Sequence, residues 1–154
     1  MSETCAHCEP CPWSGHSVIA GFGVPGRATA DALTAMGRTF CVIELNAATV
    51  GRCAHNGMHM IEGDASVEQT LRLAGVDRAS FLALTMPNEA SVLQAVKLAR
   101  AMNPSLHILA RCHFISAGME AHRRGANEVV IEEQVVAQEM VRLLNSGVAT
   151  HIRE

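Results

Sequence analysis

Aromatic side chains and basic charge are both scarce in this chain. Phe and Trp together make up 3 % of the 154 residues, and tyrosine is absent. The 15 acidic residues outnumber the 12 basic ones, so the formal net charge is −3. Single-stranded nucleic acids bind to aromatic platforms on which bases stack, and nucleic-acid domains in general carry a basic face. We therefore expect no nucleic-acid partner and a core built from aliphatic side chains.

Long apolar runs are missing as well. No stretch reaches the roughly 18 apolar residues that a membrane-spanning helix needs, and the first residues lack the basic and apolar regions of a secretory signal. We therefore expect no secretion and no direct membrane insertion. Apolar residues still make up 49 % of the chain, which is enough for one buried core at a length typical of one domain.

Apolar and amphipathic segments alternate regularly along the chain. The apolar segments predict strands at 17–21, 39–44, 58–62, 80–85, 106–111 and 128–131. Helical patterns follow them at 25–36, 46–55, 66–74, 88–102, 114–124 and 132–144. This strict alternation predicts an α/β fold with a Rossmann-like, doubly wound parallel six-stranded sheet. The expected strand order is 3-2-1-4-5-6, with helices on both faces of the sheet.

Local signals refine this prediction. Asn46 and Ser66 precede helical patterns and are expected to be N-caps, because their side chains can accept a hydrogen bond from the first helical turn. In the first helix, Ala28, Leu33 and Met36 are expected to face inward. The chain should divide into a flexible Cys-rich N-terminal segment at 1–15, a Rossmann domain at 16–146 and a C-terminal tail at 147–154.

A glycine-rich loop connects the first expected strand to the first expected helix. It reads Gly21-Phe22-Gly23-Val24-Pro25-Gly26 and matches the pattern G-x-G-x-x-G of dinucleotide-binding proteins. In that pattern the glycines allow a tight turn, a close approach of a pyrophosphate to the backbone, and close packing of helix on strand. The helix N-terminus then offers free N–H groups to the phosphates. The loop predicts a nucleotide site.

An acidic residue, Glu44, ends the second expected strand. At this position a carboxylate accepts hydrogen bonds from ribose hydroxyls and repels a 2′-phosphate. Leu45, which follows, is predicted to line the site with Glu44, and neither Leu45 nor Asn46 is an arginine that would bind such a phosphate. The sequence therefore favours NAD(H) or an adenine nucleotide over NADP.

Motifs after the later strands complete an ordered set. These are Gly63-Asp64-Ala65-Ser66, Thr85-Met86-Pro87-Asn88 and Ala110-Arg111. With the glycine-rich loop and Glu44, this set resembles the N-terminal domain of the regulators of potassium conductance, also called the RCK, KTN or TrkA-N domain. The Kef-type potassium efflux antiporters are the branch that the chain resembles most, because of the segment at 85–88 and the Arg-Gly-Ala-Asn sequence at 124–127.

The resemblance implies roles for the matched residues. Asp64 and Ala65 would flank the adenine, and Thr85 and Met86 would line the floor near the ribose and phosphates. Arg111 would reach toward the phosphates or across a dimer interface. Val24 stands where many family members carry an arginine, so the glutathione response of part of the antiporter branch is not carried over.

The resemblance also implies a regulatory function rather than catalysis. Family members sit on the cytoplasmic side of potassium channels and antiporters, bind NAD(H), ATP, ADP or AMP, and dimerise, often through the last helix. We therefore expect a homodimer at the inner face of the membrane, as an excised domain or a free-standing subunit. An NAD-dependent oxidoreductase is the alternative, with His113 as its one candidate catalytic histidine.

The cysteines give a second, independent signal. Cys5, Cys8 and Cys11 have the spacing C-x2-C-x2-C, and with His7 they could supply four ligands to zinc. His16 is a further candidate ligand. The alternatives are a linker that binds no metal, a redox-sensing thiol cluster, an iron–sulfur cluster and a crosslink between subunits.

Overall fold

The computed structural model describes residues 9–147, which form one parallel sheet with helices on both faces. Its strands are β1 (Ser17–Ala20), β2 (Phe40–Glu44), β3 (Met60–Glu62), β4 (Phe81–Leu84), β5 (His107–Cys112) and β6 (Glu128–Ile131). The order across the sheet is β3-β2-β1-β4-β5-β6, and all neighbouring strands are parallel. The predicted fold class and strand order are confirmed.

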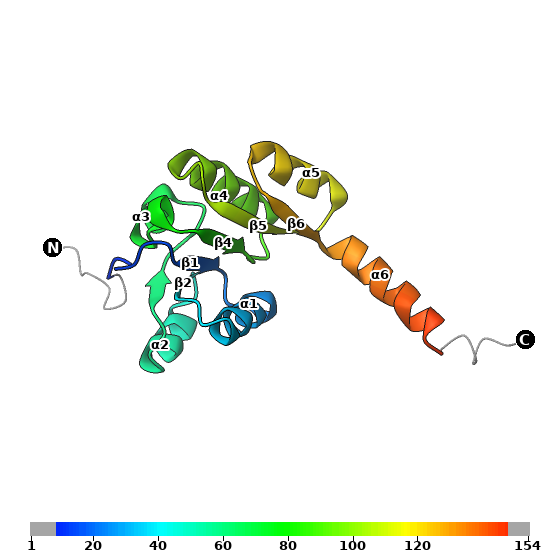
Figure 1. The fold of residues 1–154 in the computed structure, drawn as a ribbon, viewed down its shortest axis with the longest axis horizontal. Coiled ribbons are helices and arrows are strands. Elements are labelled where there is room, and N and C mark those ends of the chain that lie inside the picture. Colours follow the sequence, from blue (N-terminus) through cyan, green and yellow to red (C-terminus); the bar gives the residue numbers. More distant parts are fainter. Residues whose placement is uncertain (1–8, 148–154) are drawn as a thin grey trace, which may run out of the picture.

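Each expected helix is present. They are α1 (Val24–Ala35), α2 (Ala47–His55), α3 (Glu68–Leu73), α4 (Glu89–Met102), α5 (Ile115–Arg124) and α6 (Glu132–Asn145), and a short 3-10 helix, η1 (Val76–Arg78), follows α3. Helices α1 and α2 cover one face of the sheet, whereas α3, α4 and α5 cover the other (Figure 1). Right-handed crossovers between parallel strands require helices on both faces once the strand order reverses.

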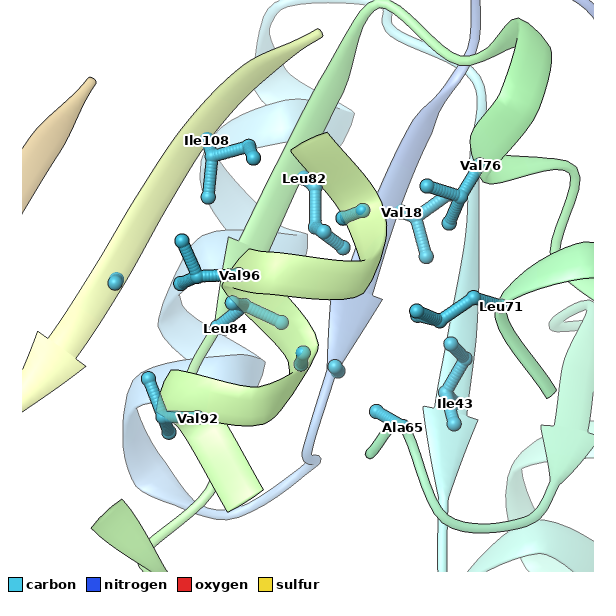
Figure 2. Packing of buried hydrophobic residues seen from close by; sticks show 14 of the residues in the cluster. Val18, Ile43, Ala65, Leu71, Val76, Leu82, Leu84, Val92, Val96 and Ile108 are labelled. Carbon is cyan, nitrogen blue, oxygen red and sulfur yellow. The ribbon is translucent and has the colours of Figure 1, made fainter. Parts of the chain in front are cut away.

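The larger hydrophobic core lies between the sheet and the face formed by α3, α4 and α5. Figure 2 shows Val92 and Val96 of α4 packed over Leu82 and Leu84 of β4, and all four side chains are fully buried. Burial of each such side chain contributes about 1.5–3 kcal/mol. The smaller core on the opposite face is formed by residues such as Ile19, packed under α1 and α2.

Two local expectations are wrong. Ala28 and Met36 are exposed, because the face of α1 that packs on the sheet is the row formed by Gly26, Ala30 and Leu33. Leu33 is buried, as expected.

Ser66 does not cap α3, which begins two residues later with Val67 as its N-cap. The Asp64 carboxylate accepts hydrogen bonds from both the backbone N–H and the hydroxyl of Ser66, at 2.8 and 2.7 Å. These bonds hold Ser66 in a turn before the helix. Asn46 does cap α2, because its side chain accepts from the backbone N–H of Thr49.

The described part of the N-terminal segment, residues 9–15, packs on the domain. Cys11 is buried and its N–H donates to the carbonyl of Leu73 at 2.7 Å. The Arg78 guanidinium donates to the carbonyls of Trp13 and Cys11. Flexibility is therefore the wrong expectation for these residues. The domain boundaries remain predictions, and residues 1–8 and 148–154 lie outside the part that the structure describes.

The last helix, α6, projects away from the body of the domain (Figure 1). None of its residues is buried, although it carries several large apolar side chains. Within residues 9–147, no helix combines the length and the apolar character needed to cross a bilayer.

Candidate functional site

A cleft of about 420 Å³ opens at the carboxyl ends of β1, β2, β3 and β4. It lies where the strand order reverses between β1 and β4, which is the usual ligand position in open α/β sheets. Twelve of the thirteen residues predicted to bind the nucleotide line this cleft: Gly21, Phe22, Gly23, Val24, Pro25, Glu44, Leu45, Asp64, Ala65, Thr85, Met86 and Arg111.

The thirteenth predicted residue, Gly26, shapes the loop from behind. A Cβ at Gly26 would lie 2.1 Å from the carbonyl oxygen of Gly21, closer than any real contact. Gly21 itself has a φ of +93°, a left-handed conformation that favours glycine. A Cβ at Gly23, in contrast, would meet no atom within 4 Å. The loop therefore needs Gly21 and Gly26 for its own fold, whereas the absence of a side chain at Gly23 keeps the space in front of the loop open.

The carboxylate of Glu44 links the loop to the end of β2. One oxygen accepts from the backbone N–H of Phe22 at 2.8 Å, and the other accepts from the N–H of Asn46 at 2.9 Å. Glu44 lines the cleft at the same time. Because each carboxylate oxygen has a second lone pair, the side chain retains capacity to accept from a ligand hydroxyl.

Thr85 connects the loop to β4 on the other side. Its hydroxyl is 2.9 Å from the carbonyls of both Ala20 and Gly21, to which it can donate. The side chain is buried beneath the loop. Thr85 therefore forms part of the cleft floor, but its hydroxyl is already used by the backbone of the glycine-rich loop.

Arg111 and Glu132 connect the cleft to the first turn of α6. Arg111 lines the cleft and donates to the carbonyl of Thr85 at 3.0 Å, and its Nε forms an ion pair with Glu132. The second oxygen of Glu132 is 2.6 Å from Nδ1 of His113. The Nε2 of His113 is 2.6 Å from the carbonyl of Pro87, which also lines the cleft.

This arrangement indicates the charge of His113. Both partners of the ring, a carboxylate and a carbonyl, are acceptors, so both ring nitrogens have to carry protons. The hydrogen bond to Glu132 is the main reason why the pKa of His113 is raised, and the same bond lowers the pKa of Glu132. The alternative catalytic role for His113 finds no support in the cleft, since the ring lines no part of it.

Five further residues line the cleft: Ile43, Gly63, Pro87, Asn88 and Ser91. Gly63, Pro87 and Asn88 belong to the sequence motifs but had no expected binding role, whereas Ile43 and Ser91 were missed. The side chain of Asn88 accepts from the backbone N–H of Ser91 at 2.9 Å and caps α4. An asparagine before a helical pattern is a readable signal, and it places a second helix N-terminus at this edge of the sheet.

A second group of polar side chains lies at the opposite edge of the sheet. Cys11, His16 and Cys41 are buried, and their ligand atoms lie within 4.8 Å of one another. Hydrogen bonding with Cys41 lowers the pKa of the Cys11 thiol to about 6 and raises the pKa of Cys41. The other candidate ligands, Cys5, His7 and Cys8, lie outside the described residues.

Comparison with known proteins gives concordant matches. The family model of the TrkA-N domain matches residues 17–132. The chain is 32 % identical over 143 residues to YbaL of Escherichia coli (strain K12), whose name describes a cation/proton antiporter. This alignment covers 93 % of the chain and 26 % of YbaL, so the chain spans about a quarter of that relative.

The matching structures include a domain and a whole channel. The TrkA-N domain of the Escherichia coli inner membrane protein YbaL superposes with a TM-score of 0.83 at 32 % identity, covering 87 % of this chain and 99 % of that one. The GsuK channel bound to NAD gives a TM-score of 0.75 at 30 % identity, covering 87 % of this chain and 24 % of that one. GsuK bound to ADP gives 0.74 at 29 %, covering 90 % and 34 %.

Proposed function

Because the chain belongs to the TrkA-N domain family, we propose that it is a nucleotide-sensing regulatory domain of a potassium channel or a potassium/proton antiporter. It would act at the cytoplasmic face of the membrane. The observation that carries this proposal is the cleft at the β1–β4 switch point, which the glycine-rich loop and Glu44 line together. Similarity to an antiporter and to a channel structure supports the kind of partner.

The ligand that fits this cleft is NAD(H) or an adenine nucleotide. Its phosphates would lie against the loop in front of Gly23, where the space is open and the N-terminus of α1 is near. A ribose diol would donate to Glu44. The adenine would lie against Asp64 and Ala65, which close the cleft after β3. GsuK structures that hold NAD and ADP support both ligand classes.

A bound nucleotide would affect α6, and through it the membrane partner, by way of Arg111. This side chain contacts the cleft and Glu132, the first residue of α6, so a phosphate that attracted Arg111 would compete with Glu132 for the guanidinium. A change in that ion pair would alter the base of α6. A ligand shifts a conformational equilibrium only by the difference in its affinity for the two states.

A homodimer would provide the two states. Val136, Met140 and Leu143 form a spaced apolar row on α6, and all three are exposed in the single chain. A groove along α1, lined by Ala28, Met36 and Phe81 among others, is also uncovered. We propose that a second copy covers these surfaces, which explains why Ala28 and Met36 are apolar but not buried.

Catalysis is not part of the proposal. Among the described residues that line the cleft, the ionisable side chains are Glu44, Asp64 and Arg111, and each is already hydrogen-bonded within the protein. The oxidoreductase alternative would need a proton donor beside the nicotinamide, and its candidate, His113, does not line the cleft.

Thermal unfolding in the presence of nucleotides tests the proposal. NADH, NAD, AMP, ADP and ATP are added separately, and a ligand at 100 times its Kd should stabilise the domain by about 2.7 kcal/mol. The matched control is Gly23→Ala, in which the new methyl group meets no protein atom within 4 Å. The variant should unfold like the wild type but lose the ligand-induced shift. If none of the five nucleotides shifts the wild-type transition, the proposal is wrong.

A further inference from the structure

The group formed by Cys11, His16 and Cys41 lies at the amino edge of the sheet, away from the nucleotide cleft. Their exposed fractions are 1, 3 and 0 %, and one ligand atom from each residue lies within 4.8 Å of the other two. The described residues of the nucleotide site and this group share no member. The nucleotide site therefore does not explain why these three residues lie together.

The strand pattern places these residues together. Cys41 pairs in register with Val18, and both belong to the core under α3 and α4. Side chains alternate along a strand, so His16, two residues before Val18, faces the same side. By the same rule His59, two residues before Ile61 of β3, also faces that side. Three adjacent strands thus direct polar side chains to one face at the amino edge, where the described ligand atoms within 4.8 Å of one another are those of Cys11, His16 and Cys41, and His59 lies beside them against Trp13.

The N-terminal segment adds Cys11 to the side chains that the three strands supply. The N–H of Cys11 donates to the carbonyl of Leu73, and Arg78 donates to the carbonyls of Cys11 and Trp13. The Trp13 ring contacts the His59 ring edge-on, with 5.2 Å between centroids. These contacts close the group against solvent and hold the Cys11 thiol inside.

The hydrogen bonds of His16 leave one ring nitrogen without a partner. Its Nε2 is 2.8 Å from the carbonyl of Ala74, which can only accept, so Nε2 carries the proton. The buried Nδ1 then presents a lone pair and has no hydrogen-bond partner. A metal-binding histidine has this arrangement, with one nitrogen donating to a carbonyl and the other bound to the ion.

His59 offers the second nitrogen of this kind. Among the side chains that the structure describes, the buried nitrogen and oxygen atoms without a hydrogen-bond partner are Nδ1 of His16 and Nε2 of His59. Both rings contact Trp13, at the edge where Cys11 and Cys41 meet. Two thiols and two unpartnered imidazole nitrogens are the donor set of a tetrahedral zinc site.

We propose that Cys11, His16, Cys41 and His59 bind one zinc ion, which anchors the N-terminal segment to the amino ends of β1, β2 and β3. Zinc would bind both sulfurs as thiolates, and each thiol still protonated at the working pH would release its proton to solvent. The two thiolates would balance the charge of the ion, which a buried site requires. The ion would stabilise the fold without touching the nucleotide cleft.

Metal analysis of the full chain tests the site. Purified protein is stripped with a chelator under reducing conditions, and zinc is returned in competition with a metallochromic indicator. The wild type should bind one zinc ion. Cys41→Ser should weaken zinc binding by more than the ~10–100-fold typical for loss of an outer-shell partner. The matched control is Cys112→Ser, which removes another buried thiol, in β5, and should bind zinc like the wild type.

Cobalt spectroscopy and further variants separate the competing explanations. Cobalt-loaded wild type should show sulfur-to-metal charge transfer and intense tetrahedral bands, even if Cys41→Ser fails to fold. His59→Gln should weaken the bands, whereas the double variant Cys5→Ser/Cys8→Ser should retain them. The proposal is overturned if the wild type gives no such bands. It is also overturned if the double variant loses them, or if reduced protein forms a Cys11–Cys41 disulfide in air while zinc is present.

Discussion

The guanidinium of Arg111 lines the nucleotide cleft and pairs with the carboxylate of Glu132, the first residue of α6. Both side chains are less than half exposed, and Arg111 also donates to the carbonyl of Thr85 under the glycine-rich loop. One ion pair thus connects the cleft to the helix that has no buried residues of its own. Each part of this connection can be tested by changing one side chain.

Removing the charge of Glu132 should uncouple the nucleotide from the dimer. In Glu132→Gln the nucleotide should still bind, because Glu132 does not line the cleft. In a coupled system, nucleotide changes the dimer affinity on the order of 5–150-fold. In Glu132→Gln, nucleotide should leave the dimer affinity almost unchanged. Sedimentation with and without ligand measures it. Glu139→Gln, which affects an exposed ion pair with Arg142 on the same helix, should keep the coupling; an equal loss in both variants would contradict this prediction.

The glycines of the loop should respond differently to alanine. Gly26→Ala places a methyl group 2.1 Å from a backbone oxygen, so it should lower the free energy of unfolding by more than 1 kcal/mol, roughly the threshold above typical surface effects. Gly51→Ala is the control, since this helical position in α2 is open and alanine favours helices by about 1 kcal/mol. Urea unfolding compares the two variants. Equal stability of Gly26→Ala and wild type would show that the loop conformation is different.

Glu44 should determine the preference for an unphosphorylated ribose. Wild type should bind NAD more tightly than NADP, because the carboxylate accepts from the ribose and repels a 2′-phosphate. Glu44→Gln should weaken NAD binding by about 1.5–3 kcal/mol, the usual contribution of a charged hydrogen bond. The variant should also reduce the difference between the affinities for NAD and NADP. Calorimetric titration measures both affinities. Glu62→Gln, at the end of the neighbouring strand β3 and outside the cleft lining, should leave both affinities unchanged.

The sequence was sufficient for features that depend on local patterns. Strand order follows from the alternation of strands and helices, and the cleft follows because parallel strands end at one edge. Contacts between distant side chains could not be predicted. The pairing of Arg111 with Glu132 depends on how α6 leaves β6, and Cys11 meets Cys41 only because Arg78 and Leu73 hold the N-terminal segment.

Part of the cysteine–histidine group was nevertheless readable. His16, Cys41 and His59 belong to three adjacent strand segments, and each stands two residues before an apolar core residue of its own segment, namely Val18, Ile43 and Ile61. That period-two signal places all three on one face at one end of the sheet. Cys11 is the one residue of the C-x2-C-x2-C motif that the structure describes, and the spacing of that motif gives no indication of Cys41 or His59.

The pair formed by His113 and Glu132 should make stability depend on pH. The pKa of His113 is raised above its usual 6.5, so its contribution is complete below 6.5 and is lost as pH rises through the raised value. The pKa of Glu132 is lowered below its usual 4.5, so its contribution is present above 4.5 and is lost as pH falls. The pair should therefore stabilise the fold most between about 4.5 and 6.5.

Urea unfolding of wild type and His113→Gln, from about pH 4.5 to well above 6.5, measures this effect. The difference in unfolding free energy should shrink above pH 6.5, and this change should be smaller in a Glu132→Gln background, because the hydrogen bond to Glu132 is the largest cause of the raised pKa. Arg111 and Glu89 also face the pair, and Glu89 and the carbonyl of Pro87 still raise the pKa of His113 in the Glu132→Gln background, so a smaller part of the pH dependence remains there. A difference that stayed constant with pH would show that His113 contributes only by packing.

Dimerisation should depend on the apolar row of α6. Met140 lies in the middle of the helix with 62 % of its surface exposed, and Val136 and Leu143 stand one turn away on either side. Burial of such side chains on association contributes roughly 25 cal/mol per Å² of apolar surface. Met140→Glu should therefore produce monomers at concentrations where wild type is dimeric, as measured by sedimentation or light scattering. Lys97→Glu on α4, away from α6, is the charge control and should remain dimeric.

The unfolding temperature of the Met140 variant provides a second test. Because α6 contributes no buried residue to its own domain, the variant should unfold at the same temperature as wild type that has been diluted to monomer. A lower unfolding temperature would mean that α6 folds back onto its own chain.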